Sequence, residues 1–243
     1  LNKITYVRSH FNNDPKYPIE VKKYYTKLDS GNLDNYKNDE FRPNINFPVI
    51  FSSTAPSLVH HIGNPRKFYY GGVKLQNTSE IQFSRNLLLS SQIAYSLFSN
   101  FKDITYNPDS VMEHVRTDLV QYLKEDDIYI PRMQLDYIWS PYKNIYAKVS
   151  GGLFEEMYGG FGTEILFKPF NKNFSVGLEL FYVKQRSFNQ RFDFNSYDTF
   201  TGHINFGYRL PAGIESNISF GRYLAKDDGF TFDIARTTRS GFK

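Results

Sequence analysis

The sequence predicts an all-β protein: an antiparallel meander of strands that forms part of a transmembrane β-barrel of the outer-membrane type, with one short helix. Three observations lead to this fold class. Long segments alternate between apolar and polar residues, which is the period of a strand with two unlike faces. Aromatic residues make up 18% of the chain, and they are favoured on strands and in the girdles of membrane barrels. Finally, no apolar run approaches the roughly 18 residues of a membrane-spanning helix.

Composition argues against a helical membrane protein but fits both a membrane barrel and a soluble β-protein. The hydrophobic fraction of 40% and the mean hydropathy of -0.50 are low for a helical membrane protein, whereas a barrel averages its lipid-facing and lumen-facing residues. An aromatic-rich soluble β-protein, such as a carbohydrate-binding sandwich, fits the same numbers. The absence of cysteine excludes a disulfide framework and thiolate metal sites.

Residues 1–66 are expected to form a loop-rich N-terminal segment with a few strands. Residues 12–46 are dense in Asn, Asp, Lys and Pro, which favours long loops, and residues 1–11 read as a strand. The start at Leu1 shows no charged or apolar leader pattern, so we expect either that a signal segment has been removed or that the chain is an internal fragment. The stop at Lys243, where a turn into another strand is expected, favours a fragment of a longer barrel, whose strands are expected at residues 67–243.

The first clear strand pair lies at residues 73–84 and 87–98, with a turn at Arg85-Asn86. Residues 111–124 then change to helical spacing, because Val115, Leu119 and Tyr122 or Leu123 recur every three or four positions after a possible N-cap at Asp109-Ser110. This segment is the one predicted helix.

The rest of the chain reads as further strands joined by turns. Met133 and Trp139 mark one face of the next strand, which Ser140-Pro141 is expected to close. A hairpin is predicted at residues 226–229, where an Asp-Gly pair precedes the last strand. The remaining strands are expected at residues 146–153, 161–167, 175–182, 203–210, 214–221 and 230–235. Lengths of about 8 to 12 residues suit a tilted membrane strand better than a soluble sandwich.

Several motifs occur in a characteristic order between about residue 60 and the end of the chain. They are His114-Val-Arg-Thr-Asp118, Arg132-x-Gln-Leu-Asp-Tyr137, Trp139-x-Pro141, Glu155-x-Met-x-Gly-Gly-x-Gly-x-Glu-Ile-Leu166 and Tyr197-x-Thr-x-Thr-Gly-His203. This series resembles the YjbH family of outer-membrane β-barrel proteins, related to GfcD, from exopolysaccharide and capsule operons.

The resemblance implies a Gram-negative outer-membrane lipoprotein that takes part in polysaccharide assembly or secretion. It implies no enzymatic activity and no mapped substrate site, and the lipid-bearing N-terminal cysteine of such proteins has no counterpart in this sequence. The expected partners are outer-membrane lipid, polysaccharide and other secretion proteins.

Polar side chains on the second face of the strands are candidates for binding a ligand in the lumen. A ladder of charged and amide groups can hold an acidic polysaccharide, although an internal salt-bridge network explains the same pattern. The glutamates near the glycine cluster offer a rival function, because glycoside hydrolysis needs two carboxylates; glycines that relieve crowding in barrel strands explain the cluster equally. The candidates are Arg132, Gln134, Asp136, Lys148, Glu155, Glu156, Glu164, Lys168, Arg186, Arg191 and His203.

Other classes of function find no support. The net charge of +4 is spread without a basic run, so nucleic-acid binding is not expected. His60, His61 and His203 lack the spacing of a metal site. There is no phosphate-binding loop, dinucleotide fingerprint or nucleophile elbow, and we expect no cofactor.

Overall fold

The computed structural model describes residues 45–105, 113, 115–124 and 128–236. The chain divides into two compact units, residues 1–46 and 47–243, and every element described below belongs to the second. The strand expected at residues 1–11, and nearly all of the loop-rich stretch that follows it, lie outside the described residues.

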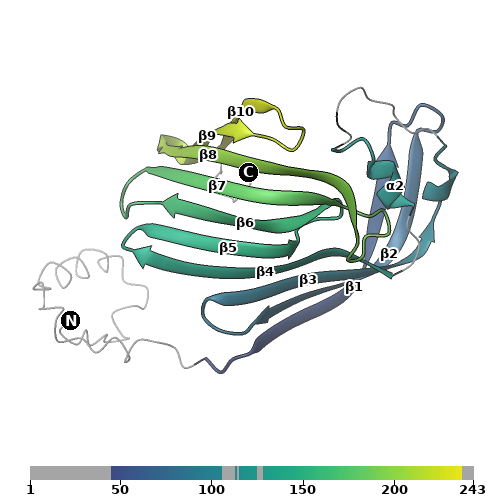
Figure 1. Cartoon of the computed structure of the whole chain (residues 1–243), viewed down its shortest axis with the longest axis horizontal. Coiled ribbons are helices and arrows are strands. Elements are labelled where there is room, and N and C mark those ends of the chain that lie inside the picture. The colour runs from purple at the N-terminus through teal and green to yellow at the C-terminus, as the bar shows by residue number, and fades with distance from the viewer. Residues whose placement is uncertain (1–44, 106–112, 114, 125–127, 237–243) are drawn as a thin grey trace, which may run out of the picture. The chain divides into compact units, whose positions relative to one another are not determined.

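The second unit is one antiparallel sheet of ten strands in sequence order (Figure 1). Each strand pairs with its neighbours along the chain, so the predicted meander is confirmed. Among the described strands, β1 and β10 do not pair with each other, and the sheet is open. The strands are β1 (Val49–Ile62), β2 (Tyr69–Gln82), β3 (Leu87–Ser99), β4 (Ile128–Tyr142), β5 (Ile145–Leu153), β6 (Tyr158–Phe167), β7 (Phe174–Arg186), β8 (Phe194–Leu210), β9 (Ile214–Arg222) and β10 (Asp228–Arg236).

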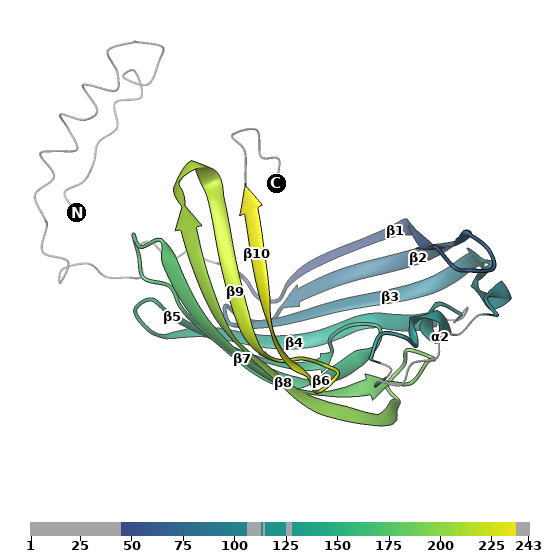
Figure 2. The same cartoon turned by 90° about the horizontal axis from the view of Figure 1, so that it is seen from above.

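The sheet is strongly curved and therefore has a convex and a concave face (Figure 2). Alternation places successive residues on opposite faces, and the register keeps each face continuous from strand to strand. Ile165 of β6 pairs with Leu178 of β7, which pairs with Ile204 of β8. Phe220 and Phe230 continue this row on β9 and β10.

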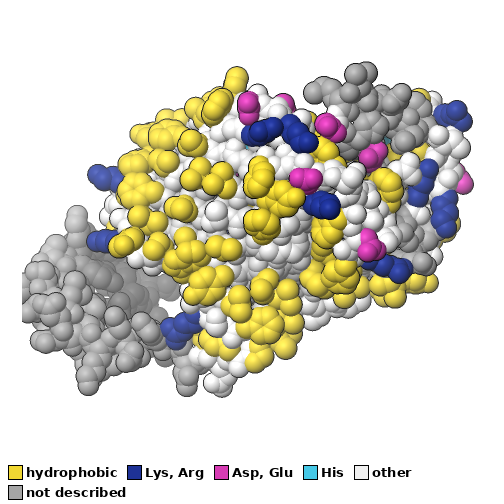
Figure 3. Space-filling model, viewed as in Figure 1, with side chains coloured by type: hydrophobic (Ala, Val, Ile, Leu, Met, Phe, Trp, Pro, Cys, Tyr) yellow, Lys and Arg dark blue, Asp and Glu magenta, His cyan; other side chains and the backbone are white. Residues whose placement is uncertain are grey.

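The convex face is apolar, as the space-filling view of that side shows (Figure 3). Its large side chains do not form a core, because they are exposed. They include Leu135, Tyr137, Val149, Phe161, Ile165, Leu178, Leu180, Ile204, Phe206, Ile218, Phe220, Phe230 and Phe232. The alternation predicted for β4 and for β6 to β9 is confirmed.

The hairpins alternate between two ends of the sheet. The short-turn rim consists of residues 83–86, 143–144, 168–173 and 211–213, the last forming the 3-10 turn η5 (Pro211–Gly213). The long-loop rim consists of residues 63–68, the described residues between 100 and 124, and residues 154–157, 187–193 and 223–227. The contrast comes mainly from the long connection between β3 and β4, and barrels in outer membranes likewise carry short turns at one end and longer loops at the other.

The described loops and short helices pack against the sheet mainly on its concave face, near the long-loop rim. There η4 (Phe101–Asp103) and α2 (Leu119–Leu123) cover the sheet. Tyr70, Phe101, Ile104 and Val120 form one buried cluster. Tyr122, Met157, Tyr158 and Val183 form a second, so α2 contributes a side chain to each.

Three local predictions need correction. The helix is shorter than residues 111–124, because residues 115–118 form turns and α2 starts at Leu119; Val120 and Tyr122 are buried while Leu119 is exposed. β4 continues through Pro141 to Tyr142, where a register irregularity accommodates the proline. The sheet begins before residue 67, since β1 pairs with β2 over its full length; the Ser and Thr residues of β1 hide its alternation.

Candidate functional site

Polar side chains from two strands, β4 and β5, form a ladder on the concave face. A nitrogen of Arg132 donates to Oε1 of Gln134 (2.9 Å), whose Nε2 donates to Oδ1 of Asp136 (2.6 Å). Ser150 of β5 donates its hydroxyl to the same carboxylate oxygen (2.5 Å). Gln134, Asp136 and Ser150 are all buried. The ladder predicted for β4 therefore exists, and its Gln-Asp-Ser part is an internal hydrogen-bond network.

A charged row lies one register step toward the short-turn rim. It runs from Lys148 through Glu164 and Glu179 to His203, each on its own strand and each paired directly with the next. Lys148 Nζ lies 2.6 Å from Glu164 Oε1, and His203 Nδ1 lies 2.8 Å from Glu179 Oε1. The two adjacent carboxylates are thus each held by a cationic or hydrogen-bonding partner at the outer end of the row.

The charged row borders open space on the concave face. A hollow of about 310 Å³ is lined by Lys148, Glu164 and Glu179 together with Asn205 and Asn217. A second hollow of about 290 Å³ extends toward the short-turn rim, where Lys168, Arg209 and Asp233 line it. Carboxylates, amides and ammonium groups around such a space can donate to and accept from the hydroxyls of a sugar.

Glycines shape the concave floor beside the ladder. A Cβ at Gly162 would lie 2.1 Å from the ring of Phe181, which crosses directly over that position. Gly152 has φ +134°, and a Cβ there would lie 2.2 Å from the carbonyl oxygen of Met133. Close approach of neighbouring groups thus explains these glycines.

The three glutamates of the sequence hypothesis do not form one site. Glu155 pairs with Arg116 at 2.8 Å and Glu156 with Lys74 at 3.8 Å, both at the long-loop rim. Glu164 stands six residues along β6 from Tyr158, which is about 20 Å of extended strand. Glycoside hydrolases keep their two carboxylates within about 5 to 9.5 Å.

Arg186 differs most from its expected role. The sequence makes it a candidate for binding a ligand in the lumen, yet its side chain is completely buried. The guanidinium donates to the carbonyls of Glu155 (2.7 Å), Ile130 (2.8 Å), Gln190 (2.5 Å), Arg191 (3.0 Å) and Pro131 (3.4 Å). Arg186 thereby joins β4 to two loops of the long-loop rim, and its guanidinium donates to backbone carbonyls.

Tyr122 of α2 completes the packing around Arg186. Its hydroxyl donates to the carbonyl of Arg186 at 2.6 Å. Burial, followed by the negative charge of Asp118, raises the pKa of Tyr122 to about 12. Gln190 donates to the carbonyl of Tyr122 at 2.8 Å, so helix, strand and loop hold one another.

The remaining candidates lie at the two rims. Lys168 is exposed at the short-turn rim, and Arg191 is exposed in the β7–β8 loop of the long-loop rim. The described part of the chain contains no group of three acidic or histidine side chains that could hold a metal ion. Within that part there is also no helix long and apolar enough to span a membrane.

Sequence reasoning missed Glu179 as a neighbour of Glu164. The turn at residues 168–173 by itself would place residue 167 opposite 174, whereas the structure pairs 167 with 176 and therefore 164 with 179, an offset that the sequence does not signal. It missed Lys74 and Arg116 because loops far apart in sequence bring these cations to Glu156 and Glu155.

These features define an all-β protein whose single curved sheet has one apolar exposed face and one polar concave face. Residues 9–243 match the family described as exopolysaccharide biosynthesis protein YbjH. The chain is also 33% identical, over 195 residues, to the uncharacterized lipoprotein YjbH of Escherichia coli (strain K12). The chain belongs to this exopolysaccharide biosynthesis family.

The alignment with the Escherichia coli lipoprotein covers 76% of this chain and 28% of that protein. The chain thus spans less than a third of the length of this relative. No solved structure matches the chain.

Proposed function

We propose that the chain forms part of a transmembrane β-barrel in the outer membrane and takes part, without catalysis, in assembling or secreting exopolysaccharide or capsule. The observation that carries this proposal is the continuous apolar row of Ile165, Leu178, Ile204, Phe220 and Phe230 on the convex face. All five side chains are exposed. An apolar surface across this many strands is unfavourable in water, and the hydrocarbon chains of a bilayer can bury it.

The extent of the apolar segment on each strand supports a bilayer as that cover. On β7 the convex positions from Phe174 to Tyr182 are all apolar, and they span nine residues. Membrane strands need about 9 to 11 residues to cross the hydrocarbon layer. Beyond this segment the convex face carries Lys184 opposite Asp198, as expected where a strand leaves the hydrocarbon.

The concave face would then line a wet lumen. Its hollows are bordered by the charged row, by amides and hydroxyls, and by apolar side chains such as Ile138 and Leu166. The polar groups suit a hydrated, hydroxyl-rich chain. Membership in an exopolysaccharide family supports polysaccharide as the material handled, with other secretion proteins as partners.

A non-catalytic role agrees with how the glutamates are used. Glu155, Glu156 and Glu164 each pair with a different cation. The rival enzyme hypothesis predicts that E155Q, E156Q or E164Q leaves folding intact and abolishes glycan hydrolysis. We expect instead that the wild-type protein releases no reducing sugar from the polysaccharide of its host, so that the variants have no activity to lose.

The proposal is tested by fractionating the membranes of cells that carry the full-length protein and by comparing unheated and boiled samples on a detergent gel. We expect the protein in the outer membrane and a mobility shift on boiling. Recovery in the soluble fraction without detergent would overturn the barrel and favour a glycan-binding β-domain. In cells lacking the protein, loss of surface polysaccharide is the expected phenotype.

A further inference from the structure

The two rims of the sheet differ in charge. The described residues of the long-loop rim contain seven basic and seven acidic side chains, whereas the short-turn rim contains four basic side chains and no acidic one. The four are Arg85, Lys143, Lys168 and Lys172.

These four cations are accessible. Each is exposed, and no ion pair to Lys143, Lys168 or Lys172 is present among the described residues. At the long-loop rim, by contrast, opposite charges pair with each other, as Arg116 does with Glu155. The short-turn rim thus presents positive charge outward.

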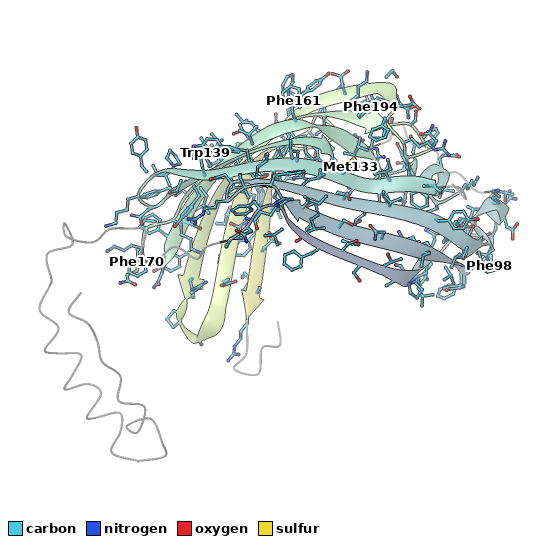
Figure 4. All side chains as sticks on the ribbon, turned by 90° about the horizontal axis from the view of Figure 1, so that it is seen from below. Phe98, Met133, Trp139, Phe161, Phe170 and Phe194 are labelled. Atoms are coloured by element: carbon cyan, nitrogen blue, oxygen red, sulfur yellow. The ribbon has the colours of Figure 1, made fainter. Side chains whose placement is uncertain are left out.

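Aromatic side chains accompany these cations. Trp139, Phe167, Phe174 and Tyr208 lie on the convex face near the turns. Phe167 and Phe174 flank their turn directly, whereas Trp139 and Tyr208 stand four and three residues before theirs. The rings of Phe167 and Phe174 are 6.2 Å apart, and those of Tyr137 and Trp139 are 5.4 Å apart. Phe170 is 79% exposed at the tip of its turn. Figure 4 shows Trp139 on the convex side and Phe170 at the turn.

At this rim the aromatic rings lie on the strands and the lysines lie beyond them in the turns. This order of groups matches a bilayer interface. The rings occupy the boundary between hydrocarbon and headgroups, and the ammonium groups reach the phosphates, toward which an anionic surface attracts them. The long-loop rim lacks this match, because among its described residues as many side chains are acidic as are basic.

We propose that the short-turn rim binds the phosphate groups of anionic phospholipids in the leaflet that it meets, which fixes this end of the sheet toward the periplasm. The inference rests on the proposed membrane barrel, whose short turns would be periplasmic. The occupant is a phospholipid leaflet, and Lys143, Lys168 and Lys172 make the contact.

Trp139 provides a local probe, because it is the single tryptophan of the chain and stands four residues before Lys143. The full-length protein is reconstituted into phosphatidylcholine vesicles with a fixed fraction of phosphatidylglycerol, and bromine, which quenches tryptophan on contact, is placed on one lipid or the other. Tryptophans outside this chain are replaced by phenylalanine. We expect quenching by brominated phosphatidylglycerol to exceed that by brominated phosphatidylcholine severalfold at equal mole fraction, and to weaken in high salt.

The decisive comparison uses two triple variants that remove the same charge. K143Q/K168Q/K172Q should abolish the preference for phosphatidylglycerol. K67Q/K102Q/K124Q, at the long-loop rim, should keep it. Equal quenching by both lipids in a heat-modifiable wild-type protein, or a preference that survives in the first variant, would overturn the lipid site and leave the barrel standing. A protein that neither shifts on boiling nor is quenched by either lipid would overturn the barrel itself.

Discussion

The concave face near the long loops and the convex face of the same strands use apolar side chains in opposite ways. On the concave side, Tyr122 and Val183 pack into a closed cluster with loop residues. On the convex side, Ile204 and Phe220 are adjacent in register, yet both remain exposed. The first surface is stabilised by the chain itself, and the second depends on its surroundings. Substitutions on the two faces should therefore respond differently to lipid.

Arg186→Met tests the packed region and should have the largest effect. The change leaves the carbonyls of Ile130, Glu155 and Gln190 without their buried donor, and we expect a loss of about 4 kcal/mol in the free energy of unfolding. Urea unfolding in vesicles measures it. Arg209→Met is the control, since its ion pair with Glu215 is exposed and should contribute less than about 1 kcal/mol. Similar effects for both would contradict the role assigned to Arg186.

Ile204→Arg tests the convex face. A cation at the middle of a lipid-facing strand costs about 2–4 kcal/mol, so folding into vesicles should weaken by that amount. Asn205→Arg, one residue further along β8 and on the concave face, should cost much less. In a soluble domain Ile204→Arg would be an exposed change worth about 0.5 kcal/mol or less, and that outcome would argue against a lipid-facing surface.

Asp136→Ala tests the buried ladder on the concave face. Gln134 and Ser150 would lose their shared acceptor, at a cost of about 1–3 kcal/mol. Asp136→Asn keeps an acceptor oxygen and should recover part of the loss. Thermal unfolding of the two variants measures the difference; a ligand-binding defect with unchanged stability would instead assign Asp136 to polysaccharide.

Tyr122 gives the smallest effect, one that depends on pH. Its folded-state pKa of about 12 lies above the ordinary value of 10.0, so the unfolded chain releases the proton first as pH rises. The stability that the protonated Tyr122 adds to the free energy of unfolding is complete below pH 10 and decreases from there toward pH 12. The loss should reach about 1 kcal/mol by pH 11. Tyr122→Phe should be less stable at neutral pH and should lack this part of the alkaline decline. Parallel curves for the two proteins would contradict a raised pKa.

Prediction succeeded where neighbouring residues along the chain carry the signal. Alternation predicts that Met133 and Trp139 lie on one face of β4 while Arg132 and Asp136 lie on the other face. This prediction is confirmed. The start of β8 was missed because its Asn, Ser and Asp residues resemble a loop, although it pairs with the end of β7. The site was predictable to a similar degree. The Gln134-Asp136-Ser150 network and the Lys148-to-His203 row lie on the expected face, whereas the pairing of Glu155 and Glu156 depends on distant loops.

The sequence by itself determined the alternating strands, their order and the polar or apolar character of each face, because these properties arise from residues one or two positions apart. Tertiary structure decided what each polar group does. Arg186 has the same chemistry as Arg191, but only the folded chain shows that one is completely buried among carbonyl groups and the other is exposed. Carbonyls from β4 and from two loops converge on Arg186. No local pattern contains that convergence, since it depends on how segments far apart in the sequence meet.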